Sequence, residues 1–423
     1  MKTFTDINKV KVTELRSYPK YHKKDTSYLE MNTKYYLSLN IFMYITFIVF
    51  LLLQRQENNC QPFLHNSDEN TPIQHLSTSR KSRSQSNLLH KSFDERVNDI
   101  FPKEVPLPTY SCHGQPYKKR DIHISESPDI KFGGNATKQL EYAYKEMNAN
   151  IPYLVRSGRS LTTFLHLLNT IDLSLRCGYF YVPYTTYQDI DRKEWVSELQ
   201  EIKKKYKIRD IFPEVFFYHH GLRFADPRIQ NYVRNRNIID MGAYIGDSAL
   251  VFFPYTDEKV YSYEYSLKNV KEMEKTFREN NIPSDKYLII NAGISNESAV
   301  VMIEDDSGIS SGNKIKINGG KVQINMTTID DEAKKYKMKV GMIKGDIEGF
   351  ELKALEGAKE TLKRDRPIIS VSLYHHWDEF FGIPKLVREL ENYEFEFSVG
   401  TWSNNFGLNE LILFGYPKEI LDN

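Results

Sequence analysis

A short segment beginning at Asn237 combines an acidic residue with two closely spaced glycines. Its sequence is NIIDMGAYIGDSALVFFP, in which an apolar strand ends in Asp240, a turn carries Gly242 and Gly246, and a helix starts near Asp247. Glycine has no Cβ, so the backbone can turn tightly here and approach a ligand that lies across the carboxyl end of the strand. The segment therefore predicts a cofactor-binding loop of Rossmann type.

A second acidic residue follows at a spacing that suits a nucleoside ligand. The strand VYSYE ends in Glu264, twenty-four residues after Asp240, and a carboxylate there can accept both hydroxyls of an adenosine ribose. Nicotinamide enzymes use the same device but need G-x-G-x-x-G to hold a pyrophosphate, and Tyr244 occupies the place of the middle glycine. A ligand without pyrophosphate fits better, and S-adenosylmethionine is one.

Two carboxylates and an imidazole stand at the ends of later strands. Asp346 follows the segment VGMIKG, Glu348 comes two residues later, and His375 lies near the end of PIISVSLYHH. Methyl transfer from the sulfonium of S-adenosylmethionine is an in-line displacement, so a protein that catalyses it must align the reactants and help remove a proton. An unperturbed imidazole titrates near pH ~6.5, which makes His375 the candidate general base. Asp346 is expected to contact the methionine part of the cofactor or the acceptor hydroxyl, and Glu348 to bind the acceptor.

Structural roles stay open for each of these three side chains. Asp346 could cap the following helix, Glu348 could serve as its terminal acid, and a single histidine at a strand end can be purely structural. Asp346 and Glu348 could also hold a divalent metal. Oxygen-ligand sites need more groups than the sequence identifies, so we predict no metal.

The elements that must position these residues alternate in the order of a doubly wound sheet. SLKNVKEMEKTF predicts a helix capped by Ser266, YLIIN a third strand and SAVVMIED an extra strand. The polar, glycine-rich segment 307–321 predicts a mobile loop that covers the acceptor. A fourth strand, a single helix through residues 352–362, a fifth strand and a helix near 384–390 follow. The closing strands YEFEFSVG and ELILFGYP are expected to pair as an antiparallel hairpin at one sheet edge, which completes the order of a class I methyltransferase fold.

Six motifs together resemble one known family. DMGAYIGDS, YEYSLKNV, NAGIS, TTIDD, KGDIEGFELKALEGA and ISVSLYHH are similar, in this order, to the FkbM-type S-adenosylmethionine-dependent methyltransferases, over roughly Ile238 to His376. KGDIEGFE is close to that family's hallmark K-x-D-[VI]-E-G-x-E. Gly345 stands where an apolar residue is usual, and Tyr244 stands where asparagine is common. These departures bear on fine specificity rather than on the fold.

The resemblance implies a Rossmann-like enzyme that uses S-adenosylmethionine to O-methylate hydroxyls of sugars, glycans or related metabolites. The residues that we expect around the cofactor are Asp240, Gly242, Ala243, Gly246, Glu264, Asn291, Ala292 and Asp346. Two other functions stay open. One is an NAD-dependent or nucleotide-sugar-dependent Rossmann enzyme, although the G-x-G-x-x-G motif of such enzymes is missing from this sequence. The other is a catalytically inactive binding module of the same fold.

Residues 131–236 precede the methyltransferase-like domain, 237–423, and predict a mainly helical accessory region that packs on it. Apolar residues have helical spacing in TTFLHLLNTIDLSL and in WVSELQEIKKKY. His219 and His220 are adjacent, but no third ligand is spaced to complete a metal site with them. A structural role is favoured for both histidines.

Charge and cysteine content argue against other classes of protein. Lys and Arg total 57 and Asp and Glu total 56, so no broad positive field is available for a phosphate backbone, and nucleic acid is not an expected partner. The 3 cysteines are widely spaced and form no CxxC pair, which favours neither a zinc site nor a disulfide-built fold. Hydrophobic residues at 40% provide enough apolar material for a core.

Residues 35–54 predict a transmembrane signal anchor, because YYLSLNIFMYITFIVFLLL carries no charge and approaches the ~20 residues that cross a bilayer as a helix. Lysines of the tail, 1–34, precede this segment and only Arg55 follows closely, so the positive-inside rule places the N-terminus in the cytosol. The stem, 55–130, is rich in Ser, Asn, Gln, His and Pro and is expected to be flexible. The catalytic domain then faces the ER or Golgi lumen or the cell exterior. The glycosylation sequons at Asn135, Asn296 and Asn325 are compatible with that location, although such tripeptides also occur by chance.

Overall fold

The computed structural model describes residue 97 and residues 101–107, 136–177, 185–303, 322–399 and 410–422. The expected N-terminal tail, the transmembrane anchor at 35–54, most of the stem and the expected mobile loop at 307–321 lie outside these residues. None of the described helices is both long enough and apolar enough to span a membrane.

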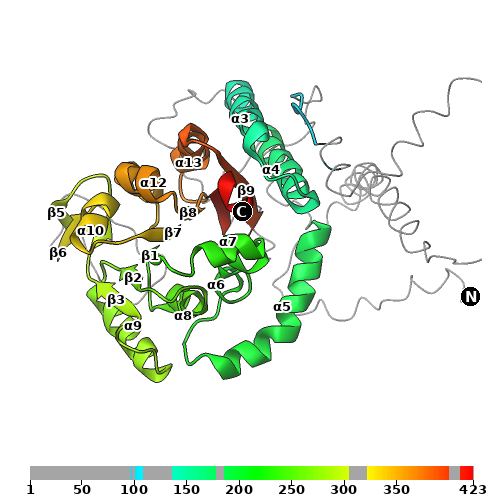
Figure 1. Cartoon of the computed structure of the whole chain (residues 1–423). Helices are drawn as coiled ribbons and strands as arrows, with labels where there is room; N and C mark the ends of the chain where they lie inside the picture. Colours follow the sequence, from blue (N-terminus) through cyan, green and yellow to red (C-terminus); the bar gives the residue numbers. More distant parts are fainter. Residues whose placement is uncertain are drawn as a thin grey trace, which may run out of the picture. The chain divides into compact units, whose positions relative to one another are not determined.

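A seven-stranded sheet forms the centre of the described fold (Figure 1). In spatial order its strands are β3 (Tyr287–Ile290), β2 (Val260–Tyr263), β1 (Asn237–Met241), β7 (Val340–Gly345), β8 (Ile368–Ser372), β10 (Leu411–Pro417) and β9 (Tyr393–Val399). The first five are parallel, and β10 runs antiparallel to both β8 and β9. The sheet therefore confirms the predicted Rossmann-like methyltransferase fold with a C-terminal antiparallel hairpin.

The burial of each strand agrees with its place in the sheet. Every residue of β1, β2, β7 and β8 is buried, as expected for parallel strands that are covered on both faces. The edge strand β9 instead alternates buried and half-buried residues, with Tyr393, Phe395, Phe397 and Val399 on the buried face. The central strands thus need helices on two sides, and the edge strand needs them mainly on one.

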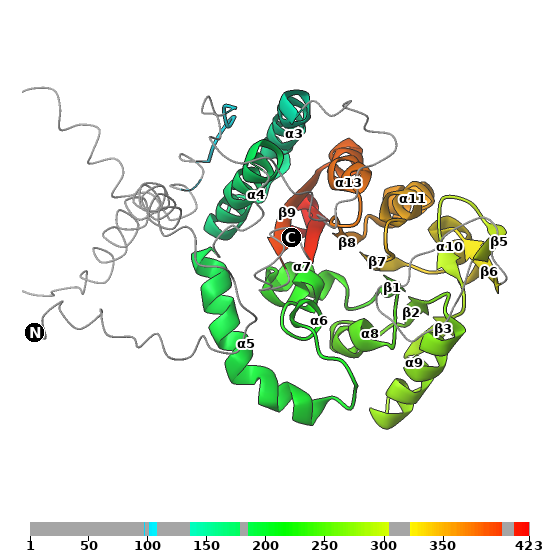
Figure 2. The ribbon, with the colours of Figure 1, turned by 180° about the vertical axis from the view of Figure 1, so that it is seen from behind.

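Helices cover both faces of the sheet and form two hydrophobic cores (Figures 1 and 2). The first core contains side chains from α3 (Ala136–Asn150), α4 (Gly158–Cys177), α10 (Ile329–Lys335), α11 (Glu351–Glu356), α12 (Lys359–Asp365) and α13 (Trp377–Glu389). The second contains side chains from α5 (Thr186–Lys205), α6 (Pro213–Phe216), α7 (Pro227–Tyr232), α8 (Asp247–Phe252) and α9 (Leu267–Glu279). Helices on the N-terminal side of β1 therefore share both cores with the sheet.

A second, small sheet lies outside the main one. It consists of β4 (Gly293–Ile294), β6 (Val322–Thr327) and β5 (Ala299–Ile303), and Ile303, Ile324 and Met326 form its own small core. The sequence predicted β5 as an extra strand. Its partner β6 was not predicted.

The single helix predicted through residues 352–362 is wrong, because the chain forms α11 and α12 with a break at Gly357. A Cβ at Gly357 would collide with the carbonyl oxygen of Ser295, so the backbone just after β4 approaches the chain at this point. Glycine allows the close approach and is also a poor residue for a helix interior. The spacing of apolar residues gave no sign of the interruption.

Part of the predicted flexible stem is ordered against α3, which corrects that prediction. Val97 and Phe101 are buried in the first core. The backbone N–H of Val105 donates to Asn148 Oδ1 at 3.0 Å, and Asn148 Nδ2 donates to the carbonyl oxygen of Val105 at 2.9 Å. The stem is polar on average, so its composition did not indicate that Val97 and Phe101 are buried.

Candidate active site

The carboxyl ends of the parallel strands meet at one sheet edge. Met241 of β1 pairs with Tyr263 of β2 and with Gly345 of β7, and Gly345 pairs in turn with Val371 of β8. The residues that follow these strand ends are the glycine turn, Glu264, Asp346 and His375, in the place where ligands bind in open α/β sheets. The sheet therefore brings the candidate residues of the sequence to one edge.

The glycine turn after β1 has the tight geometry that the sequence predicted. Gly242 has φ +70° and Gly246 has φ +85°, in the left-handed region that favours glycine. A Cβ at Gly242 would collide with the carbonyl oxygen of Asp346, and one at Gly246 would lie 2.5 Å from Phe277 of α9. The glycines thus let the turn, including the buried Ala243, pack against β7 and α9.

The two departures from the family pattern have structural explanations. Tyr244 also has a positive φ of 45°, and its hydroxyl donates to Asp210 at 2.8 Å and contacts Arg209. The segment after α5 therefore holds the turn through this tyrosine. At Gly345, a Cβ would lie 2.7 Å from Met241 Cε, so the methionine occupies the space that an apolar residue would need.

Glu264 binds the backbone of the glycine turn and the backbone of the segment that follows β2. Its Oε2 accepts from the N–H of Tyr244 at 3.0 Å and its Oε1 accepts from the N–H of Ser266 at 2.8 Å. Burial raises the pKa of this carboxyl to about 7. Asn291, after β3, donates to the carbonyl oxygens of Glu264 at 3.0 Å and Tyr265 at 2.9 Å, and the buried Ala292 follows it. These contacts fix the acid at the edge.

Asp240 and Lys344 form a fully buried ion pair beneath the turn. Lys344 Nζ lies 3.1 Å from Asp240 Oδ1 and donates to the carbonyl oxygens of Gly242 at 3.0 Å and Met241 at 3.3 Å. Asp240, expected beside the cofactor, therefore uses its carboxylate on the protein and ties the turn to β7. Our sequence reasoning missed Lys344, although it is the lysine of the KGDIEGFE motif.

His375 lies between carboxylates on both sides of its ring. Its Nδ1 is 3.0 Å from Glu351 Oε1, and its Nε2 is 3.5 Å from Asp346 Oδ1 and 3.6 Å from Glu348 Oε2. Burial alone would lower the pKa of His375, but the charges of Glu351, Asp346 and Glu348 raise it to about 10. In this state the imidazole is protonated, so Asp346 and Glu348 are the groups beside it that can accept a proton.

Glu351 is a site residue that the sequence reasoning missed. It is fully buried, and its carboxylate accepts from the N–H groups of Ile347 at 2.7 Å and Gly349 at 3.0 Å as well as facing His375. Burial would raise its pKa, but His375 lowers it to about 2. The last acid of KGDIEGFE is the signal that could have identified it.

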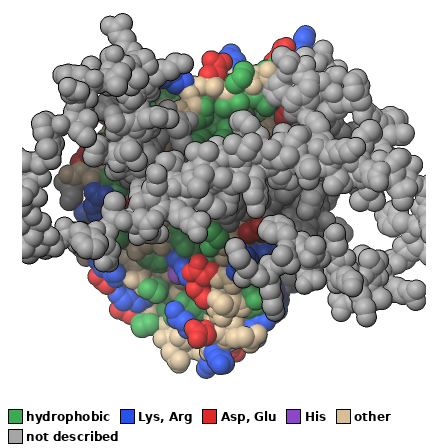
Figure 3. Space-filling model, turned by 90° about the vertical axis from the view of Figure 1, so that its right-hand side faces the viewer, with side chains coloured by type: hydrophobic (Ala, Val, Ile, Leu, Met, Phe, Trp, Pro, Cys, Tyr) green, Lys and Arg blue, Asp and Glu red, His purple; other side chains and the backbone are tan. Residues whose placement is uncertain are grey.

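Further acidic side chains surround Asp346. Burial and the charge of Asp346 raise the pKa of Glu410, just before β10, to about 8. Burial and the charge of Glu410 raise the pKa of Glu214 on α6. The hydroxyl of Tyr374 donates to Asp346 Oδ1 at 3.2 Å. On the face in Figure 3, by contrast, acidic and basic side chains of the described residues are interspersed. The acid-rich sheet edge favours a cationic ligand.

His219 and His220 are held by hydrogen bonds away from this cluster. His219 Nδ1 lies 2.8 Å from the hydroxyl of Tyr255, and His220 Nε2 lies 2.8 Å from Ser248 Oγ. Burial lowers the pKa of His219 to about 4 and also lowers that of His220, so both rings are neutral. Their contacts favour the structural role expected for them.

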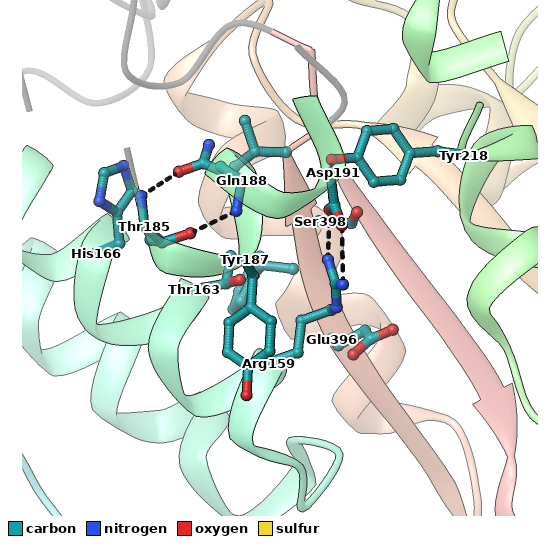
Figure 4. A pocket seen from close by; sticks show the side chains of 12 residues that line it. Arg159, Thr163, His166, Thr185, Tyr187, Gln188, Asp191, Tyr218, Glu396 and Ser398 are labelled. Carbon is teal, nitrogen blue, oxygen red and sulfur yellow. Dashed lines mark hydrogen bonds and ion pairs between the residues drawn. The ribbon is translucent and has the colours of Figure 1, made fainter. Parts of the chain in front are cut away.

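A separate small pocket, partly open to solvent, lies between α4, α5 and the end of β9 (Figure 4). Arg159 binds Asp191 through two hydrogen bonds of 2.5 Å and 3.0 Å, and Tyr218 donates to the same carboxylate at 2.8 Å. Glu396 and Ser398 of β9 complete this polar wall. The sequence singled out none of these residues, because they come from segments far apart in the chain.

Comparison with known proteins gives one family match. Residues 240–397 match the methyltransferase FkbM domain. No curated protein matches the chain. Among solved structures, a methyltransferase FkbM from Methylobacillus flagellatus KT shares 18% identity, with 66% of this chain and 60% of that chain covered and a TM-score of 0.44. An O-methyltransferase from Bacillus cereus in complex with SAH shares 14% identity, with 54% and 97% covered and a TM-score of 0.33.

Proposed function

We propose, from the match of residues 240–397 to the methyltransferase FkbM domain, that the protein transfers a methyl group from S-adenosylmethionine to a hydroxyl of a sugar, glycan or related metabolite. The observation that carries the proposal is the placement of Glu264 beside the glycine turn, at the same sheet edge as Asp346 and His375. This edge offers a nucleoside position next to a group of proton acceptors.

The residues at the nucleoside position suit this cofactor. A carboxylate has about four acceptor positions, and Glu264 uses three of them on the N–H groups of Tyr244 and Ser266 and on the side chain of Asn269. It can accept both ribose hydroxyls when one of them replaces Asn269. Asn291 and Ala292 follow β3 and are placed to border the adenine. When bound, S-adenosylmethionine supplies an electrophilic methyl group on a positively charged sulfur, and the acidic side chains beside Asp346 favour that charge.

The chain's own part in the reaction is to position the acceptor and take its proton. We assign that proton to the group formed by Asp346, Glu348 and His375, as the sequence suggested. Because His375 is protonated when the site is empty of ligands, one of the two carboxylates on its Nε2 side is the acceptor in that state. Glu351 keeps the ring in place from the Nδ1 side.

Calorimetric titration of the full-length protein with S-adenosylmethionine, S-adenosylhomocysteine and NAD tests the cofactor. We expect the two sulfur compounds to bind with micromolar Kd and the Glu264→Ala variant to bind them about 100-fold more weakly, since two hydrogen bonds to a charged acceptor are lost. Glu279→Ala, an exposed acid of α9, is the matched control. Binding of NAD alone would overturn the proposal.

The acceptor is tested separately by methyl transfer from radiolabelled cofactor to a panel of glycans and free sugars. Label in a hydroxyl-bearing sugar that disappears with Glu348→Gln supports the proposed acceptor class. Label that appears only in protein, nucleic acid or amine acceptors contradicts it, even if the cofactor binds as expected.

We also propose that residues 35–54 anchor the protein in a membrane with its catalytic domain in the lumen or outside the cell. Asn296 and Asn325 are exposed, so both sequons are accessible to a glycosyltransferase. Expression in a eukaryotic cell followed by glycosidase treatment tests the orientation. A mobility shift that is lost in Asn296→Gln/Asn325→Gln supports it, and an unglycosylated, protease-sensitive domain on the cytosolic side contradicts it.

A further inference from the structure

The side chains around His375 form a set of metal-ligating atoms. Asp346, Glu351 and His375 each offer one ligand atom, and these atoms all lie within 4.8 Å of one another. Glu348 adds a fourth group, with its Oε2 3.6 Å from His375 Nε2. The imidazole, which is only 2% exposed, is held between the acids rather than projecting into solvent.

The separations on the Nε2 side suit a bound ion better than direct hydrogen bonds. A hydrogen bond from a ring nitrogen to an oxygen usually spans about 2.7–3.2 Å. Nε2 lies 3.5 Å from Asp346 Oδ1 and 3.6 Å from Glu348 Oε2. Neighbouring ligand atoms around an ion with bonds of about 2.1 Å lie roughly 3.0–3.4 Å apart, so small side-chain shifts would bring both oxygens to that spacing.

We propose that Asp346, Glu348 and His375 bind one divalent transition-metal ion, such as Mn²⁺, on the Nε2 side of the imidazole. An imidazole ligand favours transition ions over Ca²⁺ and Mg²⁺, which prefer oxygen. The ion takes the place of the proton on Nε2. Asp346 and Glu348 each bind it through one carboxylate oxygen, which leaves the second oxygen of either acid as the proton acceptor of the proposed reaction. It occupies the acidic edge next to the position proposed for the acceptor.

The surroundings of His375 match the support that metal-bound histidines need. Such histidines direct their other ring nitrogen to a carboxylate, which fixes the orientation of the ring. Glu351 fulfils this role at 3.0 Å from Nδ1, and two backbone N–H groups hold its own oxygens. Tyr374 similarly donates to Asp346. Both a ligand carboxylate and the ligand imidazole therefore have orienting partners.

Lys344 is a buried cation near Asp346, and its ammonium group is bound to other residues. Lys344 is bound to Asp240 and to the carbonyl oxygens of Met241 and Gly242, under the glycine turn. It therefore leaves the Nε2 side of His375 to another cation. The role of that ion, to hold the acceptor hydroxyl in line with the methyl group, rests on the proposed function.

The test is a titration of full-length protein with Mn²⁺, in which electron paramagnetic resonance measures the free ion, without any acceptor. We expect one ion per chain with a micromolar Kd, and at least tenfold weaker binding in Asp346→Asn and in Glu348→Gln. Glu360→Gln, an exposed acid of α12, is the charge-matched control and should bind as the wild type does. Circular dichroism shows whether each variant is folded.

Absence of Mn²⁺ binding to the wild type, or equal binding by wild type and folded Glu348→Gln, overturns the proposal. The sulfonium of S-adenosylmethionine is the other cation that these acids could bind. The Mn²⁺ titration is therefore repeated with S-adenosylmethionine and with S-adenosylhomocysteine present. If only the sulfonium compound displaces Mn²⁺, the acids bind the cofactor's charge and the metal site is wrong. Because cofactor binding is measured by calorimetry, failure of the metal site and failure of the proposed function give different results.

Discussion

Two halves of the same sheet edge are built in different ways. On the proposed cofactor side, at the ends of β1 to β3, Glu264 and Asn291 bind mainly backbone groups of neighbouring segments. On the acidic side, at the ends of β7 and β8, side chains face one another, with Glu351 and Asp346 on opposite nitrogens of His375. Contacts to backbone follow from the path of the chain, whereas contacts between side chains require several elements to be in place. Substitutions on the acidic side should therefore mainly change the rate of methyl transfer, and substitutions on the proposed cofactor side should mainly change the Kd of the cofactor.

The Asp240–Lys344 pair connects the two halves, and its loss should have the largest effect. Lys344→Met leaves a carboxylate that is 0% exposed without its partner, which should lower the free energy of unfolding by about 3–5 kcal/mol. Urea unfolding followed by circular dichroism measures it. The double variant Lys344→Met/Asp240→Asn should recover part of the loss. Equal stability of wild type and single variant would show that the halves are not joined through this pair.

Gly242→Ala should break the close approach of the turn to β7. The added Cβ meets the carbonyl oxygen of Asp346 at a residue whose φ is +70°, so we expect a loss of about 3 kcal/mol in the free energy of unfolding. Gly382→Ala in α13 is a suitable control, because its Cβ meets only the flexible end of Leu352 at 2.7 Å. Thermal unfolding of both variants compares them. Similar destabilisation in the two would contradict the argument.

Glu351→Gln should separate the two halves functionally. Loss of the charge beside Nδ1 should bring the pKa of His375 down from about 10 toward its usual value near ~6.5, as measured by NMR of the imidazole in metal-free protein. Methyl transfer should fall by up to about 100-fold, since residues that orient a site have effects of this size. The Kd of S-adenosylmethionine should change by less than about threefold. Glu389→Gln, an exposed acid in α13, should change none of the three.

The smallest expected effect is a pH dependence confined to the cofactor side. The pKa of Glu264 is raised to about 7, so below that pH its carboxyl is protonated and cannot accept both ribose hydroxyls. Affinity for S-adenosylhomocysteine should therefore fall by about tenfold per pH unit below 7 and level off above it. Calorimetry between pH 5.5 and 8.5 measures the profile. A profile in Glu264→Gln as steep as that of the wild type would assign the titration to another group.

The turn and the strand ends of the proposed cofactor side could be placed from the sequence. The glycine turn, the capping residue Ser266 and the acid at the end of β2 are close in the chain, and periodicity of apolar residues fixes where strands end. The alternation of strands and helices along the chain then predicted a doubly wound sheet with a C-terminal antiparallel hairpin, which the structure confirms. The same local reasoning failed at Gly357, because only the approach of the backbone just after β4, from elsewhere in the chain, explains the break between α11 and α12.

The sequence by itself determined the doubly wound sheet, the resemblance to the methyltransferase FkbM domain and the set of acids and histidine at the strand ends. Only the tertiary structure decided how those side chains pair. It directs Asp240 to Lys344 and gives Glu351 the Nδ1 side of His375. It also brings Glu214 and Glu410, which are far apart in the chain, next to Asp346. The physical reason is that strand ends follow from local hydrophobic patterns, whereas the partner and the pKa of a buried charge depend on every element packed around it.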